Sequence, residues 1–301
     1  MNYTINQLNI FLKVVETQSI TKASEELYMT QPAVSIQLKN FQDQFKFPLT
    51  EVIGRKLYIT DFGYEIAELA GRITEEMNQL KFRTKEYEGQ LSGRLKISSA
   101  STGKYVIPFF LSDFLNRNHS VDLFLDVTNK SRVIESLKNN EIDFALVSIL
   151  PEELDVEEEI LVENKLYLVG GSEENGLSET LIYREKGSAT RFEMESYFKD
   201  MKGLKRKKIE LTSNEAVKQA VVAGLGNSIL PLIGIKNELL NGSLRIIEKE
   251  GLPMETRWRL IWLKNKKMSA VSQAYLQFLR QEKERILEKH FAWYREFTLP
   301  L

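Results

Sequence analysis

A long, narrow apolar stripe constrains this chain more than any other feature of its sequence. Between Phe62 and Tyr87, apolar residues recur with three-four spacing over about seven helical turns, and charged residues occupy most of the other positions. A stripe this narrow is typical of a helix that pairs with another helix. We therefore predict a linker helix that dimerises as a coiled coil; the alternative is that it packs only on its own chain. The stripe comprises Ile66, Leu69, Ile73, Met77, Leu80 and Tyr87.

The pattern of apolar residues differs on the two sides of this helix. Before it the spacing is mostly helical, whereas from Arg94 short apolar runs alternate with helical stretches, as in an α/β sheet. At 301 residues the chain is also too long for one ordinary core. We predict domains over residues 1–60, 61–90 and 91–301. We expect strands at residues 95–98, 121–127, 142–147, 166–169, 209–211, 244–247 and 258–263.

The first 60 residues predict three short helices and a β-hairpin, which together make a winged helix-turn-helix. The first helix has one apolar face, and Asn6 is its candidate cap. Hydroxyl side chains at Ser19 and Thr30 precede the second and third helices, and Pro32 suits the first turn of the third. Two short strands then follow, joined across residues 54–56, where a glycine and two cations fit the tip of a hairpin wing.

The third helix is predicted to present a polar face to a partner. Its apolar positions share one side and should be buried, which leaves Pro32, Ser35, Ile36 and Lys39 facing outward. Amides and hydroxyls on such a face can pair with base edges in the DNA major groove, and lysine can pair with phosphate. The expected buried stripe is Val34, Leu38, Phe41 and Phe45.

The order and spacing of these residues resemble the signature of the LysR-type transcription regulators. The run from Thr30 to Ser35, Pro48-Leu49, and Thr60 to Gly63 carry the resemblance. It implies that the protein binds double-stranded DNA, with base contacts from the third helix, a phosphate contact from its lysine and backbone contacts from the wing. For each residue the alternative is an ordinary solvated or capping role. The candidate DNA-binding residues are Ser19, Thr30, Gln31, Pro32, Ser35, Lys39, Arg55 and Lys56.

Two departures from the family pattern concern the same domain. The family usually has Leu-Glu where this chain has Phe41-Gln42, and Phe-x-Arg where it has Thr50-Glu51-Val52. Loss of that arginine predicts weaker DNA affinity or an altered position of the wing. Residues 1–61 also contain six Lys or Arg and six acids, so this domain has no net positive charge to attract DNA.

The second half of the chain resembles the effector-binding domain of the same family. That resemblance implies a two-lobed fold like that of periplasmic binding proteins, with lobe 1 over about residues 91–162 and 267–301 and lobe 2 over about 163–266. The complete fold expected is α/β, with a winged helix-turn-helix, a long linker helix and this effector domain. The similar segments are Leu91 to Ile97, Glu141 to Leu146, Gly187 to Arg191 and Ala223 to Gly226.

Ligand contacts in the cleft between the lobes are expected at strand ends and helix starts, because helix N-termini bind anions. The alternative is that these polar residues only cap helices. Segments 100–105 and 214–226 look closest to regulators of carbon-fixation operons, whose effectors include phosphorylated sugars and nucleotides. With Lys104, Lys218 and Arg191 nearby, we expect an anionic metabolite. The candidate effector-binding residues are Ala100, Ser101, Thr102, Asn129, Ser148, Thr190, Arg191, Ser213 and Asn214.

Enzymatic function is not expected. The chain has no cysteine, and its two histidines, His119 and His290, lie far apart in sequence, so we predict no catalytic residues, no metal site and no cofactor. A solute-binding or enzymatic α/β protein with an interaction module in front is the rival class. The N-terminus has no export signal and no apolar run long enough to span a membrane, which argues against a transport receptor.

We therefore expect a cytoplasmic, ligand-responsive regulator that forms dimers through the linker helix and tetramers through its effector domains. The family resemblance implies RNA polymerase as a further partner. An aromatic tail over residues 286–301 extends past the usual end of the family, and we expect it either to cover an apolar surface or to meet a second subunit.

Overall fold

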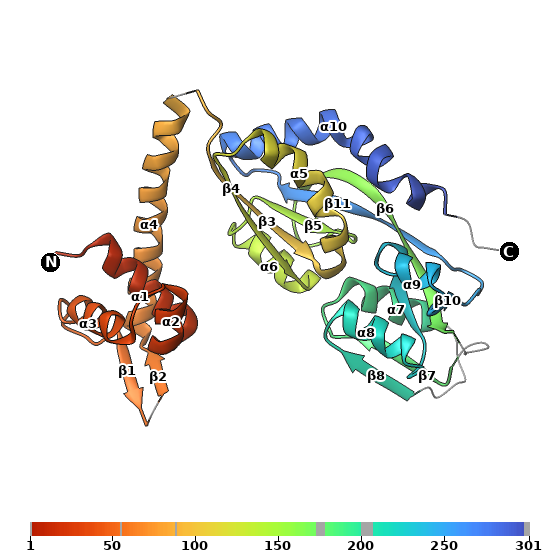
Figure 1. Cartoon of the computed structure of the whole chain (residues 1–301), viewed down its shortest axis with the longest axis horizontal. Helices are drawn as coiled ribbons and strands as arrows, with labels where there is room; N and C mark the ends of the chain where they lie inside the picture. Colours follow the sequence, from red (N-terminus) through yellow and green to blue (C-terminus); the bar gives the residue numbers. More distant parts are fainter. Residues whose placement is uncertain (1, 55, 88, 173–177, 200–206, 298–301) are drawn as a thin grey trace. The chain divides into compact units, whose positions relative to one another are not determined.

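The protein is described from a computed structural model, shown in Figure 1, which covers residues 2–54, 56–87, 89–172, 178–199 and 207–297, with no side-chain description for residues 81 and 83–87. The chain divides into two compact units, Met1–Gln90 and Leu91–Leu301. Among the residues so covered, no helix is both long and apolar enough to cross a membrane.

The first unit is a winged helix-turn-helix followed by a long helix, as expected. Its apolar core joins the first three helices, the start of the fourth and the segment before the hairpin. The two strands pair antiparallel, from Thr50 opposite Ile59 to Ile53 opposite Lys56. The elements are α1 (Ile5–Thr17), α2 (Ile20–Glu26), α3 (Gln31–Gln42), β1 (Thr50–Ile53), β2 (Lys56–Ile59) and α4 (Asp61–Tyr87).

The cap expected for the first helix was wrong. Thr4, not Asn6, caps α1: the Thr4 hydroxyl accepts from the Gln7 backbone N–H at 3.2 Å, and the Gln7 side-chain oxygen accepts from the Thr4 N–H at 3.0 Å. This reciprocal pair satisfies two backbone donors where a cap at Asn6 would satisfy one. Ser19 caps α2 as expected, whereas Thr30 occupies the cap position of α3 without a side-chain hydrogen bond.

Two glycines in the first unit are required by the backbone. Gly54, at the turn between β1 and β2, has a φ of 65°, a left-handed conformation that glycine adopts without strain. At Gly63, in the first turn of α4, a Cβ atom would lie 2.1 Å from the backbone oxygen of Leu49. Close approach of α4 to the chain entering β1 therefore depends on this glycine.

The second unit is built on a seven-stranded mixed sheet and a separate two-stranded sheet. In the large sheet the order is β10-β6-β11-β5-β3-β4, with β9 also paired to β6, and β7 pairs parallel with β8 in the small one. Strands β6 and β11 are long antiparallel partners. The strands are β3 (Gly93–Ala100), β4 (Val121–Thr128), β5 (Phe144–Val147), β6 (Val156–Gly171), β7 (Thr180–Arg184), β8 (Lys207–Leu211), β9 (Ser228–Pro231), β10 (Leu244–Ile246) and β11 (Met254–Leu263).

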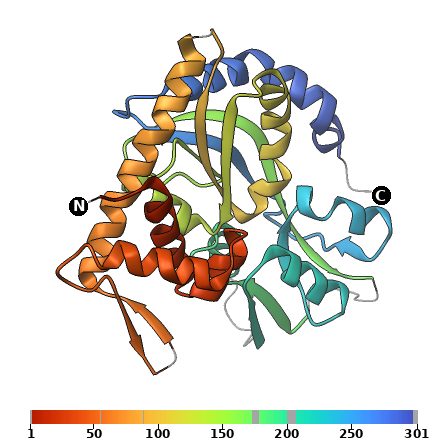
Figure 2. The same ribbon diagram turned by 60° about the vertical axis from the view of Figure 1, so that its left-hand side comes forward.

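Helices cover both faces of the large sheet. On one face α5 and α10 lie side by side in both views (Figures 1 and 2) and share a core in which the Phe110 and Phe291 rings stack at 5.7 Å. On the other face α6 packs on β5 and β11. The helices are η1 (Ser101–Tyr105), α5 (Ile107–Arg117), α6 (Lys130–Lys138), α7 (Ala189–Lys199), α8 (Asn214–Val222), η2 (Leu232–Gly234), α9 (Lys236–Leu240) and α10 (Ala270–Arg295).

The aromatic tail belongs to this packing, because Phe291 and Tyr294 are buried in the core of the second unit. The first of the two expected roles, covering an apolar surface, is therefore confirmed for this part of the tail.

The strand pattern differs from the expected one in lobe 2. Strands β7 and β9 were not expected, and β6 begins ten residues before the expected strand at 166–169. The early part of β6 contains three consecutive glutamates, a composition that strands usually lack. They fit a strand because β11 supplies partners: Arg259 pairs with Glu158 at 2.7 Å, and the Trp262 indole donates to Glu157 at 3.0 Å.

Candidate nucleic-acid interface and ligand site

The outward face of α3 is exposed as the sequence predicted. Val34, Leu38 and Phe41 are buried, and on the other side Gln31, Pro32, Ser35, Ile36 and Lys39 are exposed. Phe45, also expected in the buried stripe of the helix, lies after the end of α3 and is only partly buried. A cluster of aromatic rings fixes the buried side: Phe41 lies 5.2 Å from Phe11 and 5.1 Å from Phe45, measured between ring centroids. The helix therefore presents amide, hydroxyl and ammonium groups from a rigid support, as base-edge and phosphate recognition requires.

The two departures from the family pattern contact each other. The side-chain oxygen of Gln42, near the end of α3, accepts hydrogen bonds from the backbone N–H of Thr50 at 2.9 Å and from its hydroxyl at 2.6 Å. Thr50 begins the wing strand β1. The wing is thus tied to α3 by a neutral pair. In the wing itself Lys56 is exposed, and Arg55 lies outside the described residues.

Replacing Gln42 by Leu should release the start of the wing. The Thr50 amide then loses its acceptor, and an unsatisfied group of this kind costs about 1 to 3 kcal/mol. Hydrogen exchange of the Thr50 amide should accelerate roughly 5- to 150-fold, measured by mass spectrometry on the peptide that contains it. Gln42→Glu keeps an acceptor oxygen and should retain protection. Equal protection in Gln42→Leu and the wild type would contradict this role of Gln42.

One exposed side chain beside α3 was missed by the sequence analysis. Tyr28 is 97% exposed in the turn between α2 and α3 and has a positive φ of 52°. Its hydroxyl can donate to a phosphate oxygen if DNA lies along α3. The available signal was its position, an aromatic residue two places before the Thr30 cap, which has no place in the apolar spacing of either helix.

The acidic residues of the first unit are partly neutralised. The Lys13 ammonium lies 2.6 Å from the Glu16 carboxylate and 3.0 Å from that of Glu26. Hydrogen bonds to Glu16 and Glu26 raise the pKa of Lys13. Because Lys13 is one of the six cations, its cluster with two carboxylates has a net charge of −1 and leaves five cations and four acids elsewhere in residues 1–61, so the net charge of this segment stays at zero.

In lobe 1 three parallel strands bring their carboxyl ends to one edge. β3 pairs parallel with both β4 and β5, with Ala100 opposite Thr128 and Ser99 opposite Leu146. Ligands of α/β sheets bind at this edge. The candidate ligand residues of lobe 1 lie at these strand ends or directly after them: Ala100, Ser101, Thr102, Asn129 and Ser148.

In lobe 2 the parallel strands β7 and β8 end together. Arg184, the last residue of β7, is opposite Leu211, the last residue of β8. The start of α7 follows β7 and carries Thr190 and Arg191, and the start of α8 follows β8 and carries Ser213 and Asn214.

A hydrogen bond joins the two edges. Arg184 donates through Nη2 to the Ser101 hydroxyl at 3.2 Å, and that hydroxyl donates to the Thr128 backbone oxygen at 2.9 Å. Arg184 is only 3% exposed and also pairs with Glu185 at 2.7 Å. The strand ends of the two lobes therefore face each other across an arginine that the sequence analysis missed.

The capping alternative holds for two of the candidates. Asn129 caps α6 by accepting from the Arg132 N–H at 3.1 Å, and Ser213 caps α8 by accepting from the Ala216 N–H at 3.0 Å. Asn214 behaves differently. It is 7% exposed, and within the described ranges neither atom of its amide group has a hydrogen-bond partner. Its donor and its acceptor are both available at the N-terminus of α8.

Two of the three cations expected near the cleft already have carboxylate partners. Arg191 pairs with Glu195 at 2.8 Å and with Glu210, and the hydrogen bond that Arg191 donates to Glu210 is the main cause that raises the pKa of Arg191. Lys218 lies 2.7 Å from Glu238 and 3.0 Å from Glu215. An anion at the strand edges would thus meet amide, hydroxyl and backbone N–H donors, together with Arg184, more readily than these two side chains.

A pocket of about 480 Å³ opens between α6 of lobe 1 and the start of α7 in lobe 2. Its described lining includes Lys130, Ser131 and Ser188, together with one candidate ligand residue, Arg191. Burial lowers the pKa of Lys130 here, and burial raises the pKa of Glu193, whose charge interacts with Lys130.

Within the described part of the chain, no group of three or more His, Asp or Glu residues could hold a metal ion.

Family models match both units. The model described as the bacterial regulatory helix-turn-helix protein of the lysR family matches residues 5–64, and the model described as the LysR substrate binding domain matches residues 88–284. The HTH-type transcriptional activator CmpR of Synechocystis sp. (strain PCC 6803) is 35% identical over 289 residues, which cover 92% of this chain and 95% of that protein. The RuBisCO operon transcriptional regulator of Allochromatium vinosum is 32% identical over 297 residues, covering 95% of this chain and 98% of that protein.

Solved structures agree with these matches. The regulatory domain of CcmR from Synechocystis PCC6803, in complex with 2-PG, is 31% identical and superposes with a TM-score of 0.60 over 64% of this chain and 98% of that one. Full-length CbnR, solved as a complex with its target DNA, is 19% identical and shows the same fold, with a TM-score of 0.66 over 93% of this chain and 99% of that one.

Proposed function

The chain belongs to the LysR family of DNA-binding transcription regulators, and from this we propose which residues read DNA, how the chain assembles and what class of effector it senses. As a member it is a regulator and not an enzyme, with a helix-turn-helix that binds DNA and a domain that binds a small effector.

The α3 helix reads the DNA sequence. We assign base contacts to Gln31, Pro32 and Ser35 and a phosphate contact to Lys39, because these residues occupy the exposed face of a helix held by a buried aromatic cluster. Contacts to the DNA backbone are assigned to the wing and to the starts of α2 and α3, through Ser19, Thr30, Arg55 and Lys56, with Tyr28 added from its exposure.

The protein acts as a homo-oligomer in the cytoplasm. Four apolar side chains on one stripe of α4 are exposed in the single chain, which supports pairing of α4 with its copy in a dimer. Two α3 helices can then read a pseudo-palindromic site. Tetramers form through the effector domains, and RNA polymerase is the partner in transcription. The exposed stripe comprises Leu69, Ile73, Met77 and Leu80.

The effector is a small anionic metabolite bound between the two lobes. The observation that carries this proposal is Asn214, whose buried amide group has no partner among the described residues and lies at the start of α8. A carboxylate or phosphate there can accept from the Asn214 amide and from free backbone N–H groups. The related CcmR regulatory domain was solved with 2-PG. The proposed contact set is Ala100, Ser101, Thr102, Asn129, Ser148, Thr190, Arg191, Ser213 and Asn214, with Arg184 added.

Thermal shift with 2-PG tests the effector assignment. At a ligand concentration about 100 times Kd, binding should stabilise the effector domain by about 2.7 kcal/mol, which raises Tm by roughly 5 to 10 °C. Asn214→Ala should abolish the shift, and the exposed Asn237→Ala on α9 should leave it unchanged. An equal shift in both variants would remove Asn214 from the site. A protein stabilised by uncharged compounds only would refute an anionic effector.

A further inference from the structure

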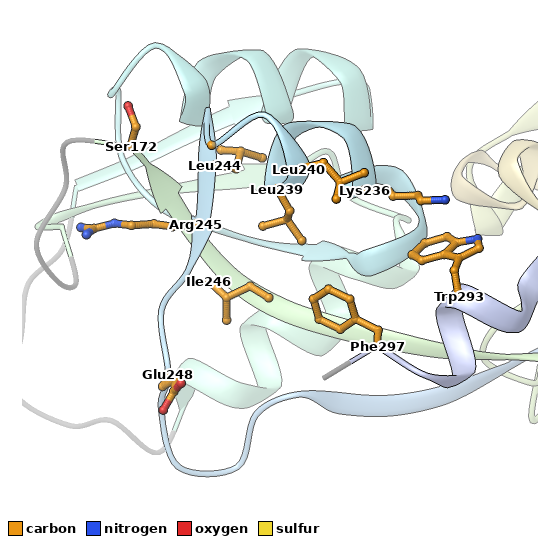
Figure 3. Close-up of a pocket in the computed structure, with 11 residues that line it drawn as sticks. Ser172, Lys236, Leu239, Leu240, Leu244, Arg245, Ile246, Glu248, Trp293 and Phe297 are labelled. Carbon is orange, nitrogen blue, oxygen red and sulfur yellow. The ribbon is translucent and has the colours of Figure 1, made fainter. Parts of the chain in front are cut away.

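A second pocket lies apart from the cleft between the lobes. It has a volume of about 590 Å³ and is formed by α9 and β10 of lobe 2 together with the end of α10 (Figure 3). None of the proposed effector contacts lines it. Its lining residues are Ser172, Lys236, Leu239, Leu240, Gly242, Leu244, Arg245, Ile246, Glu248, Trp293 and Phe297.

The walls of this pocket are mainly apolar. In Figure 3, Leu239 and Ile246 project toward Phe297 from different elements, while the Arg245 side chain points away from that space. Leu240 is 77% exposed, a large apolar side chain left in contact with solvent at the pocket. Small-molecule sites have this character: a concavity of a few hundred cubic ångströms with apolar and aromatic walls and few polar groups.

One cation stands at the aromatic end of the pocket. The Lys236 ammonium lies 4.2 Å from the centroid of the Trp293 ring. Among the described residues no carboxylate forms an ion pair with Lys236, unlike Lys218, which has two such partners. Among the lining residues that the structure describes, Glu248 alone carries a carboxylate, and in Figure 3 it lies at the opposite end from Lys236. The ammonium is therefore available to an anionic group on a ligand.

We propose that this pocket binds an amphipathic anion: a small molecule with a flat or aliphatic apolar body between Leu240 and Phe297 and a carboxylate, phosphate or sulfonate group at Lys236. The apolar body removes exposed leucine and aromatic surface from water. The anionic group gains a charge-assisted hydrogen bond beside the Trp293 ring. Neither contact involves the strand ends where the effector of the cleft is proposed to bind.

The position of this pocket gives its ligand a regulatory role. Trp293 and Phe297 follow Phe291, which packs on Phe110 of lobe 1, whereas Lys236 belongs to lobe 2. A ligand between Lys236 and these two aromatic rings contacts both lobes. It therefore stabilises the relative position of the lobes that the structure shows. Because the match to the substrate-binding model ends at residue 284, the aromatic wall comes from a segment beyond the matched part of the domain.

Two fluorescent probes that differ in one charged group test the proposal. 8-Anilinonaphthalene-1-sulfonate has an apolar ring system and a sulfonate, and N-phenyl-1-naphthylamine has the same rings without the charge. Both are titrated into the full-length protein and its variants. Lys236→Met should weaken binding of the sulfonate at least about tenfold, the range expected for loss of a hydrogen bond to a charged group, and leave the neutral probe within about twofold.

Two further variants complete the test. Lys138→Met, at the exposed end of α6, removes a lysine remote in sequence from the pocket and should leave both probes unchanged. Leu240→Glu should weaken both probes, and it should not impair folding because Leu240 is exposed. The proposal is overturned if Lys236→Met and Lys138→Met behave alike, or if Leu240→Glu leaves both probes bound as in the wild type.

Discussion

Ile73→Asp in α4 is expected to convert the protein to a monomer and to lower its affinity for an operator by about 10²- to 10⁴-fold. Ile73 is 46% exposed in the single chain, so aspartate there should leave the fold of the first unit intact. In a paired helix, however, two aspartates would be buried close to one another without partners, which costs several kcal/mol. The operator affinity falls because a dimer binds with two linked helix-turn-helix domains, and linking two binding domains raises the overall affinity by about 10²- to 10⁴-fold.

Analytical ultracentrifugation and a mobility-shift titration measure the two effects. Gln79→Asp adds the same charge to an exposed position of α4 outside the apolar stripe and should keep both the dimer and the affinity. If Ile73→Asp sediments as the wild type does, α4 is not the dimer contact. If it becomes monomeric but binds the operator with full affinity, the two heads do not act together.

Gln31→Ala and Ser35→Ala are each expected to weaken specific DNA binding by roughly 5- to 150-fold. Base contacts in the major groove contribute about 1 to 3 kcal/mol of discrimination, and both side chains lie on the exposed face of α3. Binding is measured at several salt concentrations on DNA fragments from around the protein's own gene. Binding to unrelated DNA should change little, because it depends on phosphate contacts.

Asn9→Ala on the exposed side of α1 is the matched control and should bind as the wild type does. Variants of Gln31 and Ser35 that lose affinity equally for operator and unrelated DNA would assign these side chains to phosphate and not to bases. Variants that bind the operator normally would remove them from the interface.

The sequence predicted best those elements whose residues act locally. In α3 the apolar residues repeat every three or four positions, so the buried stripe and its exposed opposite face follow from helix geometry alone. The wing likewise follows from one glycine between two short apolar runs. The hydrogen bonds between Gln42 and Thr50 did not follow from the sequence, because the two residues belong to different elements and meet only when the wing folds back on α3.

Features that depend on distant residues were missed. Arginine is normally exposed, and the burial of Arg184 depends on distant residues such as Ser101, 83 positions earlier in the chain, although its ion-pair partner Glu185 is the next residue. Strand β9 has only four residues and ends at a proline, so its sequence pattern is too short to distinguish a strand from a loop. The cap of α1 was assigned wrongly for a simpler reason. Both Thr4 and Asn6 are good capping residues, and only the reciprocal hydrogen bonds between Thr4 and Gln7 identify Thr4 as the cap.

The position of α10 in the core of the effector domain has a consequence for how the protein is made. The DNA-reading unit is complete once residue 90 has been synthesised, whereas the core around Phe110 and Phe114 needs Tyr275 and Phe291 from α10. At translation rates of about 5 to 20 residues per second, roughly 10 to 40 s separate these two events. Each newly made chain therefore passes through a period on the ribosome in which it can already fold its reading head but cannot yet sense any metabolite.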